Sequence, residues 1–395
     1  MGWNVVQQLG RFHQIWVLTH SQNRQGIEEE LRRMPLSNVG FYYIDLPGWL
    51  SFLQRFQGGI QIYAYLWQLK AYFVARRLHR RFQFDVFHHV TYANDWMANF
   101  IGALLPVPYI RGPGGGAHRT PKAFLREYSL RGRLWERLRA AGQWLFRHDP
   151  FFILSQRRAR VILVCNPEAL KAIPRKWQHK AFLFPVNGIS SRDLSLNEPS
   201  ERDDEKFRIL SAGKLLRLKG FALAIQAFKG FAERCPEAEF IIIGDGPELL
   251  RLKALVEKLG LQPQVQFEGW LPREELLIRM QSCDVFLFPS LRDGGGAVVV
   301  EAMASGKPVI CLDIGGPGLH VVEECGIKVT PRSPEQAVAD MTRALERLYT
   351  DKELRLRMGK EARARAEQVY HWDRLGERLL KIYQEALDKS VSVSW

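Results

Sequence analysis

The segment from residue 284 to residue 308 constrains the possible fold more than any other part of the chain. It opens with a short apolar run at 284–289, passes through three consecutive glycines at 294–296 and continues into a second apolar run at 297–305. Such a succession is typical of a buried strand, a tight turn and a short buried helix. Helix and strand patterns alternate along most of the sequence, which predicts an α/β fold built on doubly wound parallel sheets.

Two acidic residues surround the glycine turn: Asp293 precedes it, and Glu301 lies eight residues later on the expected helix. A helix N-terminus that is reached through glycines offers free N–H groups and the positive end of the helix dipole, so it favours a diphosphate. Glu301 lies in an apolar run, where an unpaired carboxylate would cost several kcal/mol, and the hydroxyl groups of a ligand would supply its partners. The alternative is structural: Asp293 caps the helix, and Glu301 is paired within the core.

This pattern, an acid, seven residues and a Glu followed by Ala-Met-Ala-Ser-Gly-Lys-Pro-Val, resembles the E-x7-E signature of the retaining glycosyltransferases of family 4. That family has the GT-B fold, in which two Rossmann-like doubly wound domains face a cleft. The resemblance implies that Asp293 contacts the transferred sugar, that the turn binds the diphosphate and that Glu301 holds the ribose of the nucleotide. The donor-binding residues at the turn are then Gly295, Gly296, Ala297 and Val298.

Two lysines of the second half fit the same resemblance. An expected strand at 207–212 is followed by Gly213 and Lys214, and Lys219 comes shortly before a helix expected at 221–232. Family members carry two cations at this spacing, which implies that both lysines hold the diphosphate, Lys214 as a point charge because it lacks the planar fork of Arg. Taken alone, two lysines on a loop indicate only a solvated surface. The catalytic residues implied are therefore Asp293, Lys214 and Lys219.

The expected strand at 265–271 resembles the strand whose end packs on the nucleobase in the family. The resemblance implies donor contacts from the backbone at Gly213 and near Gly269, Trp270 and Leu271. Trp270 could equally be an ordinary core residue.

The length of the chain, 395 residues, exceeds what one core holds and predicts two domains. We expect an acceptor-binding Rossmann-like domain over residues 1–188 and a nucleotide-sugar-binding Rossmann-like domain over residues 189–372. A helix expected within 373–395 resembles the terminal helix that crosses back to the first domain in GT-B proteins. In the first domain, strands are expected at 14–19, 38–44, 86–89, 109–112 and 161–165.

Cysteine usage and motif content indicate the compartment and the cofactors. The five cysteines are scattered without a C-x-x-C pair, which predicts reduced thiols in a cytosol. Neither an Asp-x-Asp motif nor a His and Cys cluster with ligand spacing is found, so we expect no metal and no cofactor. The nucleotide-diphosphate sugar, of the UDP or GDP type, is then a substrate. No uninterrupted apolar run reaches transmembrane length.

Positive charge is concentrated in the first half of the chain. Residues 1–190 carry 26 Lys and Arg against 10 Asp and Glu, whereas residues 191–395 carry 30 against 32. Within 119–139, arginines alternate with leucine and tryptophan, which suits an anionic bilayer surface; a plain solvated surface is the other interpretation. No nucleic-acid-binding motif accompanies the charge, so no such partner is expected. We expect a cytoplasmic protein, peripheral at the inner face of the plasma membrane.

The acceptor side is less constrained. Many family members carry a His in the loop after the strand that corresponds to 107–110, and here Gly114 occupies about that position, with His118 a few residues later. The glycine-rich turn at 111–116 would let a ligand approach the backbone, and Arg111 or Arg119 could bind an acidic group. The alternative is a mobile loop without a role in binding.

Two neighbouring histidines, His88 and His89, are further acceptor-side candidates. They end an expected strand that faces the cleft, and one of them could replace the His that the loop lacks. A buried structural histidine is the other interpretation for either residue.

The start of the first domain lacks an element that doubly wound domains normally have. Residues 1–12 are expected to form a helix and residues 13–19 the strand after it, with no preceding strand and glycine-rich turn. Such a first strand lies in the middle of its sheet, and burying even four apolar side chains there would contribute roughly 6–12 kcal/mol. We therefore expect the coding frame to extend upstream through a short β-branched strand and a glycine-rich loop.

The function implied is a retaining transfer of a sugar from a nucleotide-diphosphate sugar to a membrane-associated, polysaccharide or glycolipid acceptor. Two donor-site positions depart from the family pattern: Asp293 is one methylene shorter than the usual Glu, and Gly295 replaces a usual aromatic residue. The sugar pocket is therefore expected to differ in shape from the common one. Together with Gly114, these departures leave an alternative, a catalytically inactive nucleotide-sugar-binding scaffold of a polysaccharide assembly complex.

Overall fold

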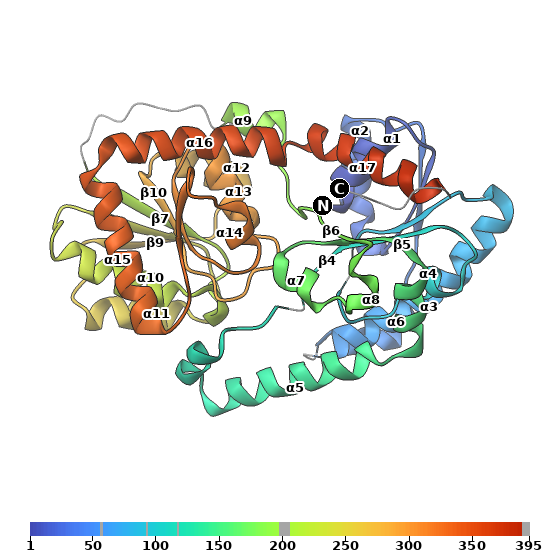
Figure 1. Ribbon diagram of the computed structural model, residues 1–395, viewed down its shortest axis with the longest axis horizontal. Helices are drawn as coiled ribbons and strands as arrows, with labels where there is room; N and C mark the ends of the chain where they lie inside the picture. Colours follow the sequence, from blue (N-terminus) through green and yellow to red (C-terminus); the bar gives the residue numbers. More distant parts are fainter. Residues whose placement is uncertain (56–57, 92–93, 117, 197–205, 389–395) are drawn as a thin grey trace.

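The computed structural model describes residues 1–55, 58–91, 94–116, 118–196 and 206–388. Strands and helices alternate along the chain and form two bodies that lie side by side along the long axis of the molecule (Figure 1). We refer to residues 1–188 as the N domain and to residues 189–371 as the C domain.

The C domain contains a six-stranded parallel sheet in the order β12-β11-β10-β7-β8-β9. Its strands are β7 (Arg208–Ala212), β8 (Glu239–Ile243), β9 (Val265–Gly269), β10 (Val285–Phe288), β11 (Val309–Leu312) and β12 (Gly326–Val329). The central strands are nearly continuous apolar runs because helices cover both faces of a parallel sheet. The first strand of the domain, β7, pairs with both β8 and β10, so the strand order reverses between β7 and β10. In open α/β sheets, ligands bind in the crevice outside the carboxyl ends of strands at such a point.

Helices cover both faces of the C-domain sheet. They are α9 (Ser191–Leu196), the 3-10 turn η4 (Arg217–Lys219), α10 (Phe221–Ala232), α11 (Leu249–Lys258), α12 (Arg273–Gln281), α13 (Ala297–Ala304), α14 (Gly315–His320), α15 (Pro334–Thr350) and α16 (Lys352–Tyr370). On one face, α10 and α15 bury Phe228 and Met341 in a first core. On the other face, α13 and α16 bury Met303 and Ala362 in a second core.

The N domain contains two separate parallel sheets. One pairs β1 (Ile15–Thr19) with β2 (Val39–Tyr43). The other has the order β3-β4-β5-β6 and contains β3 (Phe87–His89), β4 (Tyr109–Gly114), β5 (Ala159–Val164) and β6 (Ala181–Leu183). Among the described residues, no strand joins β1 to β3.

The helices of the N domain begin at residues that suit helix starts. Ser129, Asp149 and Asn166 accept hydrogen bonds from the first-turn amides of α5, α6 and α7. The elements are α1 (Gly2–Gly10), η1 (Ser21–Asn23), α2 (Arg24–Arg33), η2 (Gly48–Arg55), α3 (Gly59–Phe82), α4 (Phe100–Leu104), η3 (Lys122–Glu127), α5 (Leu130–Arg147), α6 (Pro150–Arg158), α7 (Pro167–Ala172) and α8 (Arg175–Gln178).

The last described helix, α17 (Trp372–Leu387), leaves the C domain and packs on the N domain. Its Leu379 shares an apolar core with Leu9 of α1, and Figure 1 shows α16 and α17 running along one side of the molecule. At the crossing, Ile189 N–H donates to Tyr370 O and Ile189 O accepts from Trp372 N–H, both at 2.9 Å. The two segments that connect the domains therefore lie side by side.

The strands expected in the N domain are observed at closely similar positions, with one correction. The strand expected at 109–112 continues to Gly114 and pairs with β5 through register shifts, so the prediction of a glycine-rich turn from residue 111 was wrong. The reason is close backbone packing: Gly112 has φ +103°, and a Cβ added there would lie 2.1 Å from Leu163 O. Of the helix expected within 373–395, residues 389–395 lie outside the described part of the chain. None of the helices described here is both long and apolar enough to cross a membrane.

Candidate active site

The turn between β10 and α13 forms the centre of the candidate site. Gly296 is the N-cap of α13 and has φ +57°, a conformation that glycine adopts without strain. The Asp293 carboxylate accepts hydrogen bonds from the N–H groups of Gly295 at 3.2 Å and Gly296 at 2.8 Å. Asp293 therefore holds the turn before the helix and does not cap α13 itself, whose N-cap, Gly296, has no side-chain cap. The amides of Ala297 and Val298 follow and belong to the first turn of the helix, where N–H groups have no helical partner.

An ion pair between Lys219 and Asp293 spans the site. Lys219 follows β7 and Asp293 follows β10, so the pair joins the two strands between which the sheet order reverses. Burial by itself raises the pKa of the Asp293 carboxyl, but the Lys219 ammonium and the amides of Gly296 and Gly295 outweigh burial and hold that pKa below its ordinary value. Asp293 is thus ionised at neutral pH and neutralises Lys219.

A second helix N-terminus opens on the same crevice. α10 begins after Gly220, which has φ +72°, and a Cβ added there would lie 2.0 Å from Pro289 O. Gly213, at the carboxyl end of β7, has φ +148° and packs against Gly244 at the end of β8. Lys214 is exposed beside it. Two positive helix ends and two lysines thus follow the carboxyl ends of the strands between which the order reverses, an arrangement that suits a diphosphate.

Glu301 lies one helical turn into α13, and its Oε1 accepts from Arg273 Nε at 2.7 Å. Arg273 opens α12 and also pairs with Asp193. Burial raises the pKa of the Glu301 carboxyl, and the charge of Arg273 opposes the rise. Sequence patterns give no sign of Arg273, because the pairing arises from the packing of α12 beside α13. Contact of Glu301 with a ribose stays a prediction, and the paired alternative is realised with a cation at the rim of the site.

The carboxyl ends of β8 and β9 form another rim of the site. Gly269 ends β9 with φ +75°, and its carbonyl oxygen accepts from Gly244 N–H at 2.6 Å. Trp270 follows and is 73% exposed, so its interpretation as an ordinary core residue was wrong. Leu271 packs partly buried against the second core. An exposed indole at this edge offers a flat surface of the kind on which bases stack.

Helix α14 supports the glycine turn from the C-domain side. Gly316 N–H donates to Asp293 O at 2.9 Å, and His320 Nε2 donates to Gly295 O at 2.6 Å. Because Nε2 carries the proton, Nδ1 accepts from the Tyr370 hydroxyl at 3.0 Å. Burial lowers the pKa of His320 to about 4, so the ring is neutral at neutral pH. No sequence signal identifies His320, because a single histidine at the end of a short helix does not by itself indicate a functional site.

The N domain contributes His118 and Asn166 to the same turn. Asn166 Nδ2 donates to Gly294 O at 3.1 Å, and a Cβ added at Gly294 would lie 3.2 Å from His118 Cε1. Burial, followed by the charge of Arg292, lowers the pKa of His118 to about 4. His118 Nδ1 is buried without a hydrogen-bond partner in the described part of the chain. The fold thus brings His118, an acceptor-side candidate from sequence, to the Asp293 turn.

His88 and His89 have internal positions instead. His88 Nδ1 is hydrogen-bonded to the Tyr383 hydroxyl at 2.8 Å, and Nε2 donates to Gly112 O at 2.6 Å. Both histidines line a cavity within the N domain, between β1 and β3. Their predicted position at the cleft is not observed, because β3 directs them to partners inside the domain.

Arg111 and Gly114 are likewise buried in the interior of the N domain, where both belong to β4. The Arg111 guanidinium is buried, pairs with Asp95 at 3.7 Å and donates to Gln156 Oε1 at 3.3 Å. Gly114 lies in β4, and its carbonyl oxygen accepts from Cys165 N–H at 3.0 Å. The prediction that Arg111 binds an acidic ligand is corrected by this geometry, since its charge is already compensated.

The basic segment at 119–139, which we call the strap, connects the two domains. Its turn η3 inserts Phe124 into the first core of the C domain, where the ring is fully buried. Arg292, the neighbour of Asp293, binds Glu136 of α5 at 2.7 Å. In Figure 1 the strap lies on the side of the molecule opposite to α16 and α17. The composition of the segment suggested a single surface helix. The structure instead shows the turn η3 followed by the helix α5.

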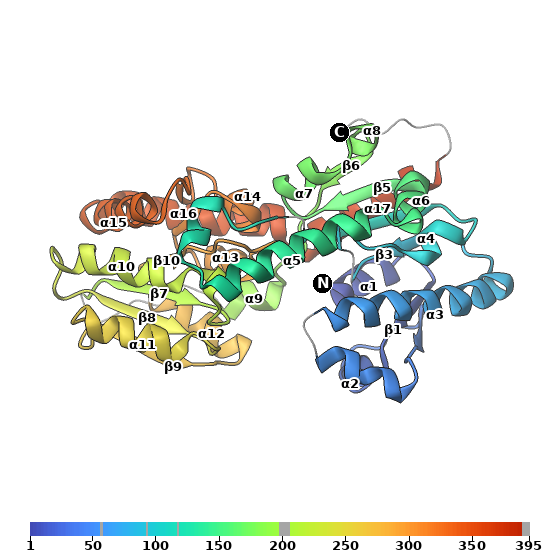
Figure 2. The same ribbon diagram turned by 90° about the horizontal axis from the view of Figure 1, so that it is seen from below.

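Beyond the strap contacts, α5 carries an exposed apolar face, and Figure 2 shows the helix running along the outside of the molecule. Between one half and four fifths of each of these side chains is exposed: Leu130, Leu134, Trp135, Leu138, Trp144 and Leu145. Arg131 and Arg137 are exposed on the same helix. In the described ranges, no group of three or more His, Cys, Asp or Glu side chains is placed to hold a metal ion.

Comparison with known proteins agrees with this geometry. Residues 195–365 match the family model of the glycosyl transferases group 1. An uncharacterized glycosyltransferase of Methanocaldococcus jannaschii is 27% identical over 324 residues, which cover 78% of this chain and 76% of the relative. A D-inositol 3-phosphate glycosyltransferase of Corynebacterium jeikeium is 32% identical over 181 residues, which cover 44% of this chain and only 42% of the relative.

Among solved structures, HepE of Anabaena, crystallised with UDP and glucose, superimposes with a TM-score of 0.57 at 17% identity, over 94% of this chain and 99% of HepE. This likeness confirms the expected fold class, the GT-B arrangement of two Rossmann-like domains. By the match to the family model, residues 195–365 are similar in sequence to a glycosyltransferase domain.

Proposed function

We propose that this protein is a retaining glycosyltransferase of family 4 that moves a sugar from a UDP- or GDP-type donor to a saccharide or lipid-linked acceptor. The observation that carries the proposal is the convergence of two glycine-preceded helix N-termini with Lys219 and Asp293 where the strand order reverses. The matched glycosyltransferase domain contains all of these groups. A donor laid across them has its diphosphate on the helix ends, its base near Trp270 and its ribose near Glu301.

The ion pair of Lys219 with Asp293 suggests how the donor is recognised. A diphosphate carries more negative charge than one carboxylate, so it competes for the Lys219 ammonium. Asp293 then accepts from a hydroxyl group of the sugar. Lys214, Lys219 and the α13 amides stabilise the charge that grows on the diphosphate as the bond to the anomeric carbon breaks. These groups supply what a metal ion supplies elsewhere, so the proposed reaction needs no metal.

Transfer with retention follows as a displacement on one face of the sugar. The bond between the anomeric carbon and the diphosphate oxygen breaks, and the acceptor oxygen bonds to the same face of that carbon. The acceptor proton passes to a diphosphate oxygen, so no protein base is required. His118, neutral at neutral pH and with Nδ1 free of partners in the described chain, is the group we propose to contact the sugar or the acceptor.

A membrane location fits the composition of α5. An amphipathic helix with an exposed apolar face and flanking arginines binds in the plane of an anionic bilayer surface. We propose that α5 holds the protein peripherally at the inner face of the plasma membrane, which would bring a lipid-linked acceptor to the cleft. The glycosyltransferase chemistry does not depend on this attachment.

Donor hydrolysis and transfer by the purified protein test the proposed activity. The protein is incubated with a panel of UDP and GDP sugars, with and without EDTA, and free nucleotide is measured; inositol 3-phosphate belongs in the acceptor panel because a relative is named for it. We expect nucleotide release that EDTA does not reduce and, by NMR, a product with the donor's anomeric configuration. Binding of a nucleotide sugar without any turnover would instead support the inactive scaffold.

A further inference from the structure

One peptide unit of the glycine turn, between Gly295 and Gly296, is held at both of its ends. Its N–H group, which belongs to Gly296, donates to Asp293 Oδ1 at 2.8 Å. Its carbonyl oxygen, which belongs to Gly295, accepts from His320 Nε2 at 2.6 Å. The two groups of a trans peptide point in opposite directions, so Asp293 and His320 lie on opposite sides of this unit. The orientation of the turn therefore depends on His320 as well as on Asp293.

The hydrogen bond from His320 matters because the peptide unit joins two glycines. Gly296 has φ +57°, and glycine populates positive and negative φ about equally, so rotation of this unit meets little resistance from the backbone itself. Rotated by half a turn, the unit would place the Gly295 carbonyl oxygen beside the Asp293 carboxylate, and two acceptors would then face each other. His320 contributes a donor that only the observed orientation can use.

His320 can donate to Gly295 in one tautomer only. A carbonyl oxygen accepts and cannot donate, so Nε2 carries the proton and Nδ1 of the neutral ring is an acceptor. The Tyr370 hydroxyl lies 3.0 Å from Nδ1 and donates to it. His320 and Tyr370 are 1% and 2% exposed, and their rings meet edge to face with centroids 4.8 Å apart. Because water hardly reaches the imidazole, the tyrosine decides which of its nitrogens is protonated.

Tyr370 is itself fixed where the chain crosses between the domains. It ends α16, and its carbonyl oxygen accepts from Ile189 N–H at 2.9 Å. A Cβ added at Gly188 would lie 2.8 Å from the same oxygen. Arg365 of α16 also donates from Nε to His320 O at 2.9 Å, which joins α16 to α14 a second time. The position of the His320 ring is therefore set by the end of α16.

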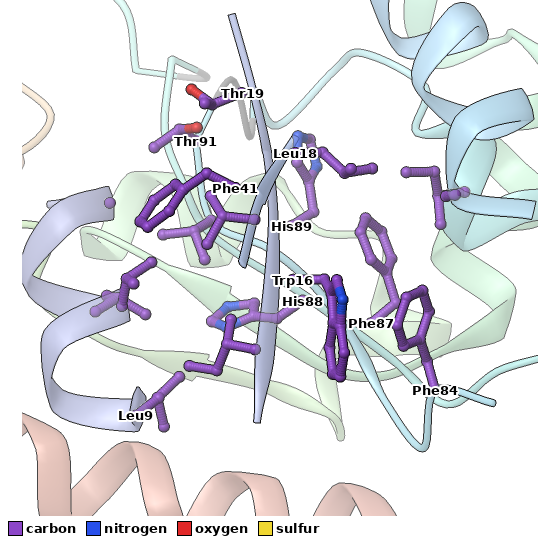
Figure 3. A pocket seen from close by; sticks show the side chains of 18 of the residues that line it. Leu9, Trp16, Leu18, Thr19, Phe41, Phe84, Phe87, His88, His89 and Thr91 are labelled. Atoms are coloured by element: carbon purple, nitrogen blue, oxygen red, sulfur yellow. The ribbon is translucent and has the colours of Figure 1, made fainter. Parts of the chain in front are cut away.

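The N domain contains the same arrangement of histidine, tyrosine and carbonyl oxygen at a different place. His88 Nε2 donates to Gly112 O at 2.6 Å, and His88 Nδ1 is hydrogen-bonded to the Tyr383 hydroxyl at 2.8 Å. Figure 3 shows His88 among the side chains that line the cavity between β1 and β3. The arrangement by itself can therefore be structural. His320 differs in the peptide unit that receives its hydrogen bond, because that unit also donates to Asp293.

We propose that His320 is a positioning residue of the transferase: through Nε2–H it keeps an N–H group of the glycine turn, and not a carbonyl oxygen, on the side where Asp293 lies and the diphosphate is proposed to bind. Tyr370 acts with it by selecting the tautomer that donates. The inference rests on the proposed function, in which amides of this turn and of α13 stabilise the charge that grows on the diphosphate. Because that charge is largest in the transition state, loss of the hydrogen bond should lower kcat more than it weakens donor binding.

The test replaces His320 in the full chain by a side chain that donates and by one that only packs. His320→Gln places an amide N–H near the position of Nε2, and we expect kcat within about threefold of the parent. His320→Leu fills the site without a donor, and we expect kcat to fall roughly thirtyfold or more while KM for the donor changes by less than about threefold. A packing role predicts the reverse order, since an apolar leucine suits the buried site better than an amide. A Leu variant at least as active as the Gln variant would overturn the proposal.

The tautomer is tested by nitrogen NMR of protein labelled at its histidines, where the signals lost in His320→Gln belong to His320. We expect the parent to carry the proton on Nε2 and Tyr370→Phe to show both tautomers, with kcat lowered roughly threefold to tenfold. Tyr383→Phe is the matched control, which should alter the signals of His88 and leave kcat unchanged. A proton on Nδ1 of His320 in the parent, or unchanged His320 signals and kcat in Tyr370→Phe, would contradict the assigned role.

The same measurements separate this inference from the proposed function. A parent protein that turns over no nucleotide sugar would contradict the proposed function, and the inference with it. An active parent with equally active Gln and Leu variants would contradict the inference alone. All activities are compared below the melting temperatures of the variants, so that a lower kcat does not reflect unfolding.

Discussion

At the scale of single residues, the main feature of the candidate site is the Lys219 ammonium, for which Asp293 and the proposed diphosphate compete. Lys219 is neutralised by Asp293, and Asp293 in turn caps the glycine turn with two amide hydrogen bonds. A ligand that takes Lys219 therefore also alters the hydrogen bonding of the turn. This coupling ties diphosphate binding to the position of the carboxylate proposed to contact the sugar.

Replacing Lys219 by Ala should lower kcat by roughly a hundredfold or more, because one preorganised cation is lost where charge grows in the transition state. Lys229→Ala, on the last turn of α10, where the lysine is 39% exposed and pairs with Glu233, is the matched control and should leave kcat unchanged. Steady-state kinetics with the donor identified in the hydrolysis panel provide the measurement. A kcat of the Lys219→Ala variant within about twofold of the parent value would show that Lys219 does not stabilise the transition state.

Gly295 occupies the position where the family usually has an aromatic residue, and the structure gives a reason. A Cβ added there would lie 2.4 Å from Val186 Cγ2 and 2.6 Å from Asn187 Nδ2. We expect Gly295→Ala to destabilise the protein by about 1–3 kcal/mol through overpacking and Val186→Ala to restore part of that loss. Gly142→Ala is the control, since nothing lies within 4 Å of its added Cβ and Ala favours the helix. If the Gly295→Ala variant and the parent unfold at the same urea concentration, the expected clash of the added Cβ with Val186 and Asn187 would be contradicted.

Some residues of the site could be predicted from sequence and others could not, for a physical reason. Asp293, Gly296 and the α13 amides come from one contiguous strand, turn and helix, whose spacing fixes their geometry. Arg273 and His320 reach the same turn from other elements, so only packing brings them there. Arg111 failed as a predicted ligand-binding residue because its partner, Asp95, lies on a separate loop.

At the scale of elements, local patterns predicted β7, β9, β10, α10 and α13 of the C domain at closely similar positions, because each is a short run that a glycine or proline bounds. The N-terminal half of the strap was predicted poorly. Its composition indicates a basic surface helix, but η3 buries Phe124 in the other domain, a contact between residues far apart in sequence. Only α5 keeps the expected exposed face.

The apolar face of α5 should bind anionic vesicles. Replacing both Leu134 and Trp135 by Glu should weaken binding roughly tenfold or more, because it removes apolar area and adds charge that the lipid repels. Leu250→Glu is the control, because this side chain of α11 in the C domain is 82% exposed. Co-sedimentation with vesicles that contain phosphatidylserine is the measurement. Equal binding to neutral and anionic vesicles would argue against the proposed surface.

At the scale of the whole molecule, the two domains are joined on both sides of the cleft. On one side, Ile189 bonds to the backbone on either side of His371. On the other, the strap places Phe124 in the C-domain core and Glu136 on Arg292. Sequence predicted the first connection by resemblance but not the second.

Replacing Phe124 by Ala should detach the strap, since a fully buried Phe typically contributes about 3–5 kcal/mol. We expect a larger radius of gyration in small-angle scattering and a lower melting temperature. Phe73→Ala, at a side chain that is 59% exposed, should change neither quantity. An unchanged scattering profile for Phe124→Ala would show that the strap does not hold the domains together.

The strap also bears on the pace of the reaction cycle. In the proposed reaction the nucleotide lies between two domains that are joined at both margins, so a wider opening of the domains for its release would require Phe124 to leave the C-domain core. Domain openings take microseconds to milliseconds, and in many enzymes they are slower than the chemical step. The packing of the Phe124 ring in the C-domain core would then set the rate of turnover, although the ring contacts no reacting atom.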